Sequence, residues 1–249
     1  LHKAIRRQRQ MCIRDRINVI AMPYVFTSWD HVLTFADSDV AATLNTAIEK
    51  QGMTILGWAA NGFRVVSSNN EINSPADFSG LKVRVGSAKL IADMLTALNA
   101  NPTTLSMSDT YSGLQTGIVS AQENPTSNII GSKFYEVQKY VTNSNHVPQC
   151  NVIFIGKSTF DALPAEYQEM IMRVSEELLP YSQQVADESN ADDLQFLQEQ
   201  GTTFIDFDQI DGMREFLRDA TLDKAIERMK ESIDPELLDA YLKAAGYSS

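Results

Sequence analysis

The sequence predicts an α/β fold with mixed, mostly parallel sheets, and two observations support this prediction. Short apolar segments with strand character alternate with longer segments of helical periodicity along the 249 residues. Hydrophobic residues form 43% of the chain, which is enough for one large domain or two smaller ones. No run of about 18 apolar residues occurs, so the sequence predicts no helix that spans a membrane.

In the first half of the chain, periodicity and turn residues predict the elements. Residues 37–50 place apolar side chains on one helical face, and Gly52 follows as a stop signal. In residues 81–85, three apolar residues alternate with Lys82 and Arg84, which predicts a strand with one apolar and one cationic face. The other predicted segments are an apolar strand or buried turn at 17–26, strands at 53–58 and 61–67, and a helical turn at 75–80.

The second half combines short strands with long helices. A helical pattern runs from Leu163 to about Gln200, with a kink predicted at Pro180 because proline cannot donate a helical hydrogen bond. Pro235 divides the closing helical segment, which ends near Gly246. The remaining predictions are helices at 89–98, 108–116 (capped by Ser108) and 125–131, strands at 103–105, 135–141, 151–155 and 204–207, and an extended run at 118–122.

The chain is acidic, with a formal net charge of −11, which disfavours nucleic acid and anionic membranes as partners. Residues 1–16 are different, because they hold six Lys/Arg and a single acid. We interpret them as a foreign or disordered basic tail rather than as part of the fold. A nucleic-acid-binding arm and the start of a signal peptide are the alternatives, but Asn18 and Pro23 interrupt the apolar run that a signal peptide needs.

Signatures of catalysis and of metal binding are absent from the sequence. No GxGxxG, GxSxG or HExxH motif occurs. Cys12 and Cys150 fit neither a zinc nor a redox pattern, and His31 and His146 have no carboxylate or cysteine at ligand spacing. We therefore predict no cofactor, no metal and no enzymatic activity.

Polar side chains at the ends of predicted strands are the remaining candidates for a site. Arg84 ends the strand that begins at Leu81, Arg64 lies twenty positions earlier, and Asn124 directly precedes a helix. Ligands of open α/β sheets collect beyond the carboxyl ends of strands, and a guanidinium there suits a carboxylate. Structural roles are the alternative: Arg84 as an edge-strand charge or the partner of an acid, Arg64 as a structural ion, and Asn124 as a helix cap.

The chain resembles the solute-binding proteins of TRAP transporters (DctP-type), and within them the sugar-acid branch that includes sialic-acid and uronate binders. The resemblance extends from about Met22 to Gln200 and is specific because several segments occur in the same order and spacing. These segments are NGFR (61–64), SGLKVRV (79–85), LQTGIVSAQENP (114–125), KFYEVQKY (133–140) and TNSNH (142–146).

The resemblance implies a two-lobed, periplasmic-binding-protein-like fold whose lobes close over an organic acid, with the long kinked helix crossing both. Lobe I would comprise 17–61, 150–187 and 217–249, and lobe II would comprise 62–149 and 188–216. The family's first strand and helix have no counterpart, so lobe I is expected to be incomplete and the chain to be an N-terminally truncated member with a foreign start.

The resemblance also assigns the site. It implies that Arg84 makes a bidentate bond to the ligand carboxylate, that Asn124 hydrogen-bonds the same group, and that Arg64 adds a cationic contact. Three further pocket positions are Asn151, Ser87 and Met107. Sialic-acid binders carry an asparagine in place of Ser87 and an aromatic residue in place of Met107, which argues against sialic acid itself.

The favoured function is the periplasmic, non-catalytic component of a TRAP-type secondary transporter that captures a sugar acid such as a uronate. It implies a monomer that works with membrane subunits but does not itself cross the membrane, and a signal peptide that is not present in this chain. The alternatives are a four-carbon dicarboxylate or other carboxylate as ligand, and a cytosolic effector-sensing domain of similar fold. The sensing domain would need a DNA-binding module, and an enzyme would need a nucleophile–base pair; neither is visible in the sequence.

Overall fold

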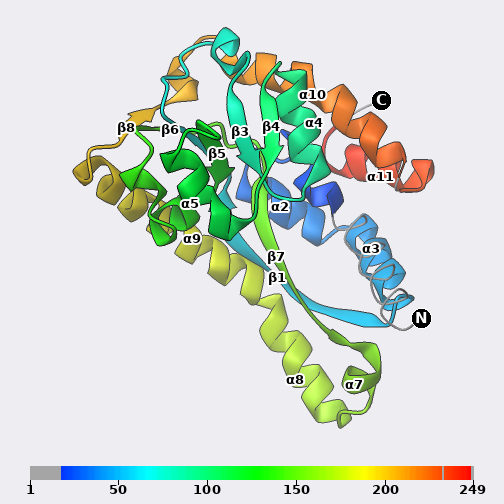
Figure 1. Cartoon of the computed structure of the whole chain (residues 1–249). Helices are drawn as coiled ribbons and strands as arrows, with labels where there is room; N and C mark the ends of the chain where they lie inside the picture. Colours follow the sequence, from blue (N-terminus) through cyan, green and yellow to red (C-terminus); the bar gives the residue numbers. More distant parts are fainter. Residues whose placement is uncertain (1–17, 232, 248–249) are drawn as a thin grey trace, which may run out of the picture.

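The computed structural model describes residues 18–231 and 233–247, which form a six-stranded sheet, a two-stranded ribbon and the helices around them (Figure 1). The strands are β1 (Met53–Phe63), β2 (Val65–Ser68), β3 (Lys82–Val85), β4 (Asn101–Thr104), β5 (Ala121–Asn124), β6 (Tyr140–Thr142), β7 (Pro148–Gly156) and β8 (Thr203–Ile205). The α-helices are α2 (Trp29–Ala36), α3 (Asp39–Glu49), α4 (Lys89–Ala97), α5 (Met107–Gln115), α6 (Thr126–Gly131), α7 (Lys157–Asp161), α8 (Ala165–Glu176), α9 (Leu178–Glu199), α10 (Met213–Lys230) and α11 (Pro235–Ala244). Short 3₁₀ helices are η1 (Asn18–Ala21), η2 (Pro75–Phe78), η3 (Phe134–Glu136) and η4 (Phe207–Gln209).

The six-stranded sheet has the strand order β4-β3-β5-β2-β6-β8. β3 runs parallel to β4 and β5, β6 runs parallel to β8, and β2 is antiparallel to both β5 and β6. Together with the antiparallel β1–β7 ribbon, the described strands make three parallel and three antiparallel pairings. The predicted α/β architecture with mixed sheets is confirmed, and β3 has parallel neighbours on both sides, but parallel pairings do not outnumber antiparallel ones as predicted, because β2 and the ribbon pair antiparallel.

Helices cover both faces of this sheet. On one face, Val66 and Val83 belong to the same apolar core as side chains of α4 and α10, which lie next to each other in Figure 1. On the other face, Val65 and Val141 pack with apolar residues of α5, α6 and α9. Because the neighbours Val65 and Val66 enter different cores, β2 is buried on both faces, as expected for the middle of a three-layer fold.

A third apolar core lies where the first and last described helices meet. The rings of Phe26, Phe35 and Tyr241 contact one another edge to face, with centroids 4.9 to 5.9 Å apart. Ile48 of α3 and Met229 of α10 join this core. The segment around residues 20–26 is therefore a buried turn, which confirms one of the two predicted alternatives for it.

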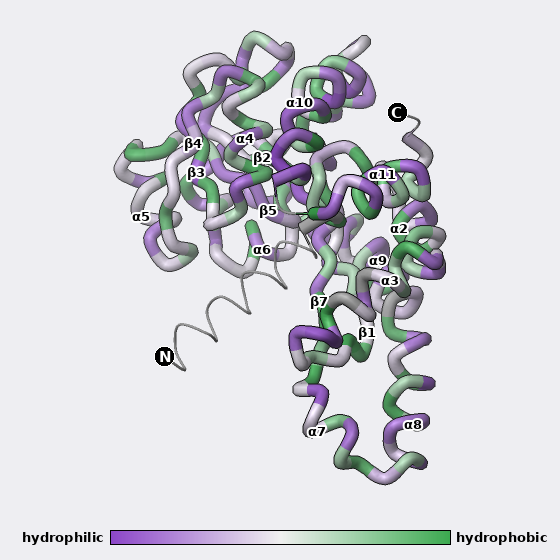
Figure 2. The backbone as a smooth tube through the Cα atoms, turned by 90° about the vertical axis from the view of Figure 1, so that its right-hand side faces the viewer, coloured by the Kyte–Doolittle hydropathy of each residue, from purple (hydrophilic) through white to green (hydrophobic). Residues whose placement is uncertain are grey.

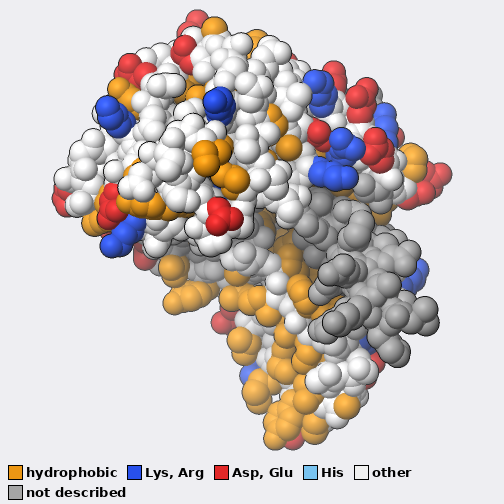
Figure 3. Space-filling view, in the orientation of Figure 1, with side chains coloured by type: hydrophobic (Ala, Val, Ile, Leu, Met, Phe, Trp, Pro, Cys, Tyr) orange, Lys and Arg blue, Asp and Glu red, His pale blue; other side chains and the backbone are white. Residues whose placement is uncertain are grey.

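The β1–β7 ribbon, α7 and α8 extend away from the sheet, and we call them the arm (residues 53–63 and 148–176; Figures 1 and 2). The two strands of the ribbon pair from Met53↔Gly156 at the outer end to Phe63↔Pro148 at the inner end. Apolar side chains gather on the surface of the arm (Figure 3). Those that are exposed include Ile153, Phe154, Tyr167, Met170 and Val174.

The arm joins the sheet at two neighbouring crossings of the chain. β1 continues into β2 through Arg64, and β6 continues into β7 through residues 143–147. The backbone N–H of Arg64 donates to the carbonyl of Val147 at 2.8 Å, which ties the two crossings together. Among the described helices, none combines the length and the apolar character that crossing a bilayer requires.

Two predicted boundaries are wrong. The turn predicted between residues 58 and 61 does not interrupt β1, and the chain breaks at Arg64 instead. The strand predicted over 135–141 is reduced to β6, because Lys133 adopts a left-handed conformation (φ 56°) that starts η3. Helix α2 was not predicted; it begins after Ser28, whose hydroxyl accepts from the N–H of His31.

The predicted kink in the long helix occurs one turn before Pro180. Helix α8 ends at Glu176 and α9 begins at Leu178, so the break comes directly after Glu176, the residue whose carbonyl the Pro180 nitrogen cannot bond. The cap of α5 also differs from the prediction: Ser106 rather than Ser108 accepts from the N–H of Asp109. The predicted basic tail at 1–16 lies outside the described residues.

Candidate ligand-binding site

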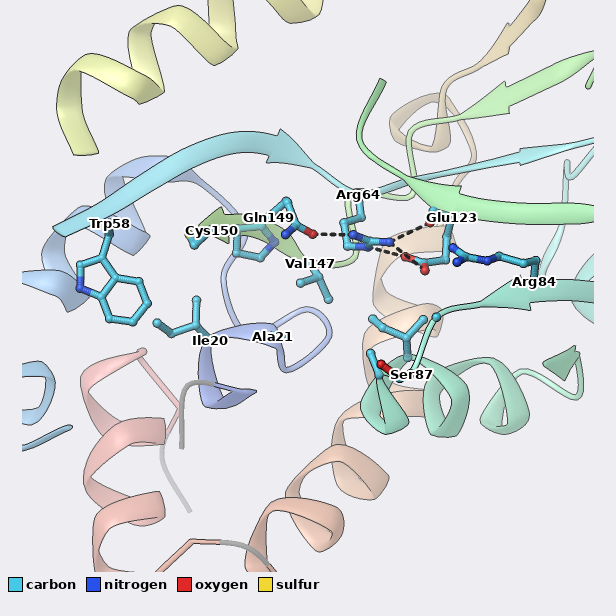
Figure 4. Close-up of a pocket in the computed structure, with 14 residues that line it drawn as sticks. Ile20, Ala21, Trp58, Arg64, Arg84, Ser87, Glu123, Val147, Gln149 and Cys150 are labelled. Atoms are coloured by element: carbon cyan, nitrogen blue, oxygen red, sulfur yellow. Dashed lines mark hydrogen bonds and ion pairs between the residues drawn. The ribbon is translucent and has the colours of Figure 1, made fainter. Parts of the chain in front are cut away.

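A pocket of about 320 Å³ lies where the arm leaves the sheet, and this volume suits a small organic ligand (Figure 4). It is formed by the carboxyl ends of β3 and β5, the start of α4, the inner parts of β1 and β7, and η1. The sequence predicts a ligand beyond the carboxyl ends of strands, and two of the residues predicted at such positions, Arg64 and Arg84, line this pocket. Ser87, a third predicted residue, lines it as well.

Arg84 projects from β3, which lies between β4 and β5 and so is not an edge strand. Only 6% of the residue is exposed, and its Nε and Nη2 donate to the carbonyl of Leu105 at 3.0 and 2.8 Å. No carboxylate of the described residues lies within ion-pair distance of it. Burial lowers the pKa of the Arg84 guanidinium and the charge of Glu123 partly opposes this, but an arginine stays protonated at neutral pH.

The guanidinium of Arg84 keeps one edge available. The bonds to Leu105 use its Nε and Nη2 on one side, whereas Nη1 makes no hydrogen bond to any residue in the described part of the chain. The edge formed by Nη1 and Nη2 is the one that can grip a carboxylate with two parallel hydrogen bonds. Both structural alternatives for Arg84, an edge-strand charge and an ion pair with an acid, are therefore excluded for the described residues.

Arg64 has the opposite environment. Its Nε donates to Oε2 of Glu123 at 2.5 Å, its Nη2 donates to Oε1 at 2.9 Å, and the pair is buried, with 15% and 2% of the two side chains exposed. Nη2 also donates to the Glu123 carbonyl at 2.8 Å and to Oδ1 of Asn124 at 3.1 Å, while Nη1 donates to Gln149. Arg64 thus lines the pocket, but its charge is neutralised by Glu123 and each of its three nitrogens already donates to a residue of the chain.

Glu123 and His146 complete this cluster and were not identified from the sequence. Burial alone would raise the pKa of Glu123, but the Arg64 charge and hydrogen bonds from His146 and Arg64 hold the pKa below its usual value. Because an ionised carboxylate only accepts hydrogen bonds, His146 donates from Nε2 at 3.1 Å, and its Nδ1 accepts from Ser144 at 2.9 Å. Burial lowers the pKa of His146 despite the neighbouring Glu123, so the imidazole is neutral.

Asn124 lies beside the pocket without lining it. Its Oδ1 accepts from Arg64 and from Nδ2 of Asn128, and its Nδ2 donates to Oε1 of Gln122 at 2.6 Å. Successive residues of a strand point to opposite faces, so the neighbouring Glu123, not Asn124, reaches the pocket. The predicted hydrogen bond from Asn124 to a ligand stays a prediction.

Two further predicted positions lie outside this pocket. Asn151 is exposed on β7; its neighbour Cys150 lines the pocket, so alternation along the strand turns Asn151 to the other face. Met107 is 40% exposed at the first residue of α5, two residues beyond the Leu105 that bonds Arg84. Their predicted contacts with a ligand stay predictions.

The pocket also has an apolar part that sequence reasoning missed. It contains Trp58 of β1 and Ile20 of η1, with Cys150 and Val147 towards the charged part (Figure 4). Burial raises the pKa of the Cys150 thiol to about 12, so this side chain is uncharged. No group of His, Cys, Asp and Glu in the described residues could hold a metal ion.

The chain is similar in sequence to known solute-binding proteins. The family model described as bacterial extracellular solute-binding protein, family 7 (DctP), matches residues 9–224. The C4-dicarboxylate-binding periplasmic protein DctP of Rhodobacter capsulatus is 32% identical over 227 residues, which are 91% of this chain and 67% of that protein. The chain spans about two thirds or less of the length of the curated relatives it matches.

Solved structures of solute-binding proteins are also similar to this chain in fold. A TRAP periplasmic solute-binding protein of Haemophilus influenzae with bound L-gulonate is similar at a TM-score of 0.80 and 26% identity, covering 90% of this chain and 73% of that one. Another, from Desulfovibrio salexigens with bound orotic acid, has a TM-score of 0.86 at 22% identity, covering 94% and 76%. The predicted two-lobed fold is thereby confirmed.

Proposed function

Because the chain belongs to the bacterial extracellular solute-binding proteins of family 7, we propose that it captures a small organic acid in the periplasm for a TRAP-type secondary transporter. The family is one of transport proteins rather than enzymes. In this proposal the chain delivers the bound acid to the membrane subunits of the transporter and has no catalytic step.

The observation that carries the proposal is the environment of Arg84. A buried charge without a partner costs several kcal/mol, and proteins usually pair it with an opposite charge. Arg84 is buried, has only a neutral carbonyl as partner among the described residues, and presents a two-pronged edge at a pocket. A ligand carboxylate would supply the missing negative charge and satisfy both donors.

Arg84 alone does not account for useful affinity. A hydrogen bond to a charged group contributes about 1.5–3 kcal/mol, whereas micromolar binding needs about 8 kcal/mol. We propose that Ser87, Asn124 and Arg64 contribute further contacts, and that Asn151 and Met107 do so when the lobes close. In this proposal lobe I (17–61, 150–187, 217–249) and lobe II (62–149, 188–216) approach each other and exclude water from the carboxylate.

We propose a sugar acid such as a uronate as the ligand, and a four-carbon dicarboxylate as the second candidate. The sugar acid is supported by the sequence resemblance and by the L-gulonate bound to the similar Haemophilus influenzae protein. The dicarboxylate is supported by the name of the Rhodobacter capsulatus relative. Arg84 would hold one carboxylate in either case.

A thermal-shift titration tests the role of Arg84. D-Galacturonate, L-gulonate and succinate are added separately to the chain, and the rise in melting temperature is measured. We expect at least one acid to raise it, Arg84→Met to abolish the rise, and Arg173→Met, which removes an exposed arginine of α8, to leave it unchanged. An undiminished rise in the Arg84→Met variant, or no rise with any acid, contradicts the proposal.

A further inference from the structure

Helix α4 begins at the pocket, and no side chain caps its first turn. Its N-cap residue, Ala88, has no side-chain group that accepts a hydrogen bond, and no acidic residue lies in the first turn. Residues 86–88 and Ile91 line the pocket, so the start of this helix borders the same space as Arg84. The start of α4 is therefore part of the pocket wall.

The backbone N–H groups of residues 89–91 are open donors. The first N–H groups of an α-helix have no carbonyl one turn earlier to bond. In α4 the first backbone bond is donated by Ala92, to the carbonyl of Ala88, and residues 89–91 donate no backbone bond to any described residue. The starts of α3 and α5 differ, because the hydroxyls of Ser38 and Ser106 accept an N–H there.

A helix start attracts anions, because its open N–H groups and the helix dipole both place positive partial charge there. This holds for every helix, so a ligand is indicated only where a second feature of the same place points to one. Arg84 is that feature: 6% of the residue is exposed, and its Nη1 makes no hydrogen bond to a described residue.

Arg84 and the start of α4 lie close together. A Cβ atom built on Gly86 would lie 4.0 Å from Nη2 of Arg84, which places the guanidinium beside the loop that leads into α4. In Figure 4 the side chain of Arg84 extends into the pocket, and Ser87 lies at the start of the helix below it. Donors from β3 and from α4 therefore border one part of the pocket.

Building on the proposed function, we propose that the first turn of α4 is the second half of the anion site: Arg84 grips the ligand carboxylate, and backbone N–H groups of residues 89–91 donate to the same carboxylate. An ionised carboxylate has about four lone-pair positions, so the bonds from Arg84 leave room for bonds from the helix. Because the helix holds these N–H groups in place, they bind without the ordering cost of a long side chain. Arg84 supplies the charge, and α4 fixes the orientation of the acid.

Removal of one backbone donor tests this inference. Lys89 is the first residue of α4, where proline is tolerated, and the extended conformation of Ala88 (φ −80°, ψ 106°) is compatible with a following proline. Lys89→Pro removes the N–H and the lysine charge, whereas Lys89→Ala removes only the charge. Calorimetry on chain 1–249 uses whichever of D-galacturonate, L-gulonate and succinate binds most tightly. We expect Lys89→Pro to bind this acid about ten-fold more weakly than Lys89→Ala does.

A second test fills the helix start from within and does not depend on proline. Ala88→Asp places a carboxylate at the N-cap, where it can accept from the open N–H groups and compete with the ligand. We expect the melting temperature without acid to rise and the affinity for the acid to fall at least one hundred-fold. Gly156→Asp is the matched control, because it adds the same charge at the uncapped start of α7, outside the pocket, and should leave the affinity within two-fold.

The outcomes separate this inference from the proposed function. Equal affinities of Lys89→Pro and Lys89→Ala overturn the inference but leave the carboxylate function intact. The same holds if Ala88→Asp binds the acid as the unmodified chain does, or if it melts at a lower temperature without acid, because the added side chain would then not cap the helix. Absence of binding by all three acids, or binding that survives Arg84→Met, overturns the proposed function itself.

Discussion

Two arginines line one pocket, and their surroundings differ in a way that separates stability from binding. Arg64 is held by both carboxylate oxygens of Glu123, by Gln149 and by Asn124. Arg84 is the more buried of the two, yet within the described chain its donors meet only the carbonyl of Leu105. Among the described residues, the first charge is neutralised by an ion pair and the second has no counter-charge, so we assign the first to the architecture and propose that the second binds a ligand.

The largest expected effect is on folding, from breaking the Arg64–Glu123 pair. Arg64→Met leaves the buried carboxylate of Glu123 without its cation, which we expect to lower the free energy of unfolding by about 3–5 kcal/mol. The double variant Arg64→Met/Glu123→Gln removes both charges and should recover a large part of this loss. Urea unfolding followed by circular dichroism measures both values. A single variant as stable as the unmodified chain would show that the pair is not the structural anchor we describe.

The second prediction concerns Arg84 in the absence of ligand. Arg84→Met removes a buried charge that has no counter-charge among the described residues, and it replaces the aliphatic part of the side chain with one of similar length. We expect the free energy of unfolding to change by less than about 1 kcal/mol, or to rise, even though two bonds to Leu105 are lost. The same urea titration is the measurement. A loss as large as that of Arg64→Met would remove the distinction between the two arginines.

Local sequence patterns identified the strand of Arg84 but not the character of its surroundings. Alternation in residues 82–85 predicts β3 correctly, with Val83 and Val85 buried. It also suggested a cationic outer face, whereas Arg84 is buried because β4 and β5 flank the strand and packing covers both faces. Which strands flank β3 depends on the topology of the sheet, and the periodicity of a local sequence segment does not reveal that topology.

Local sequence patterns could not predict the cluster around Arg64 for a similar reason. Glu123 lies 59 positions after Arg64, and His146 lies 23 positions after Glu123, so no spacing in the sequence links them. The sequence pointed to Asn124 rather than to the preceding Glu123, because two neighbouring polar residues at the carboxyl end of β5 cannot be told apart until the face of the strand is known. The resemblance to a family supplied the fold and the candidate residues of a site, but not which side chains are already paired.

A smaller, pH-dependent effect is expected from His146, which donates to Oε2 of Glu123, the same oxygen that accepts from Nε of Arg64. Its pKa in the folded chain is lower than the ordinary value of about 6.5 because the ring is buried. The stability that comes from the neutral ring is therefore fully present above about pH 6.5, and it is lost as the pH falls through the folded-state pKa. The lowered pKa of Glu123 acts in the same direction but further into the acid range.

We expect the difference in unfolding free energy between the unmodified chain and His146→Gln to shrink as the pH is lowered from 7 to 5. The slope from one proton cannot exceed about 1.4 kcal/mol per pH unit. Taking the difference removes the contribution of the many other acidic groups, which titrate in both proteins. A difference that is constant over this range would show that His146 does not titrate on unfolding in the way its burial implies.

The smallest effect on the free energy of unfolding is expected from a third arginine. Its ion pair is exposed, so a comparison with Arg64 shows how much burial contributes. Arg218 forms an ion pair with Asp219 at 2.9 Å, a distance comparable with those in the Arg64 cluster, but 43% and 69% of the two side chains are exposed. Solvent and salt screen such a pair, so Arg218→Met should lower the free energy of unfolding by less than about 1 kcal/mol, and by less still in 1 M salt. If urea titrations instead gave a loss close to that of Arg64→Met, contact distance rather than desolvation would govern these pairs. Burial would then give a guanidinium such as Arg84 no particular need for the carboxylate of a ligand.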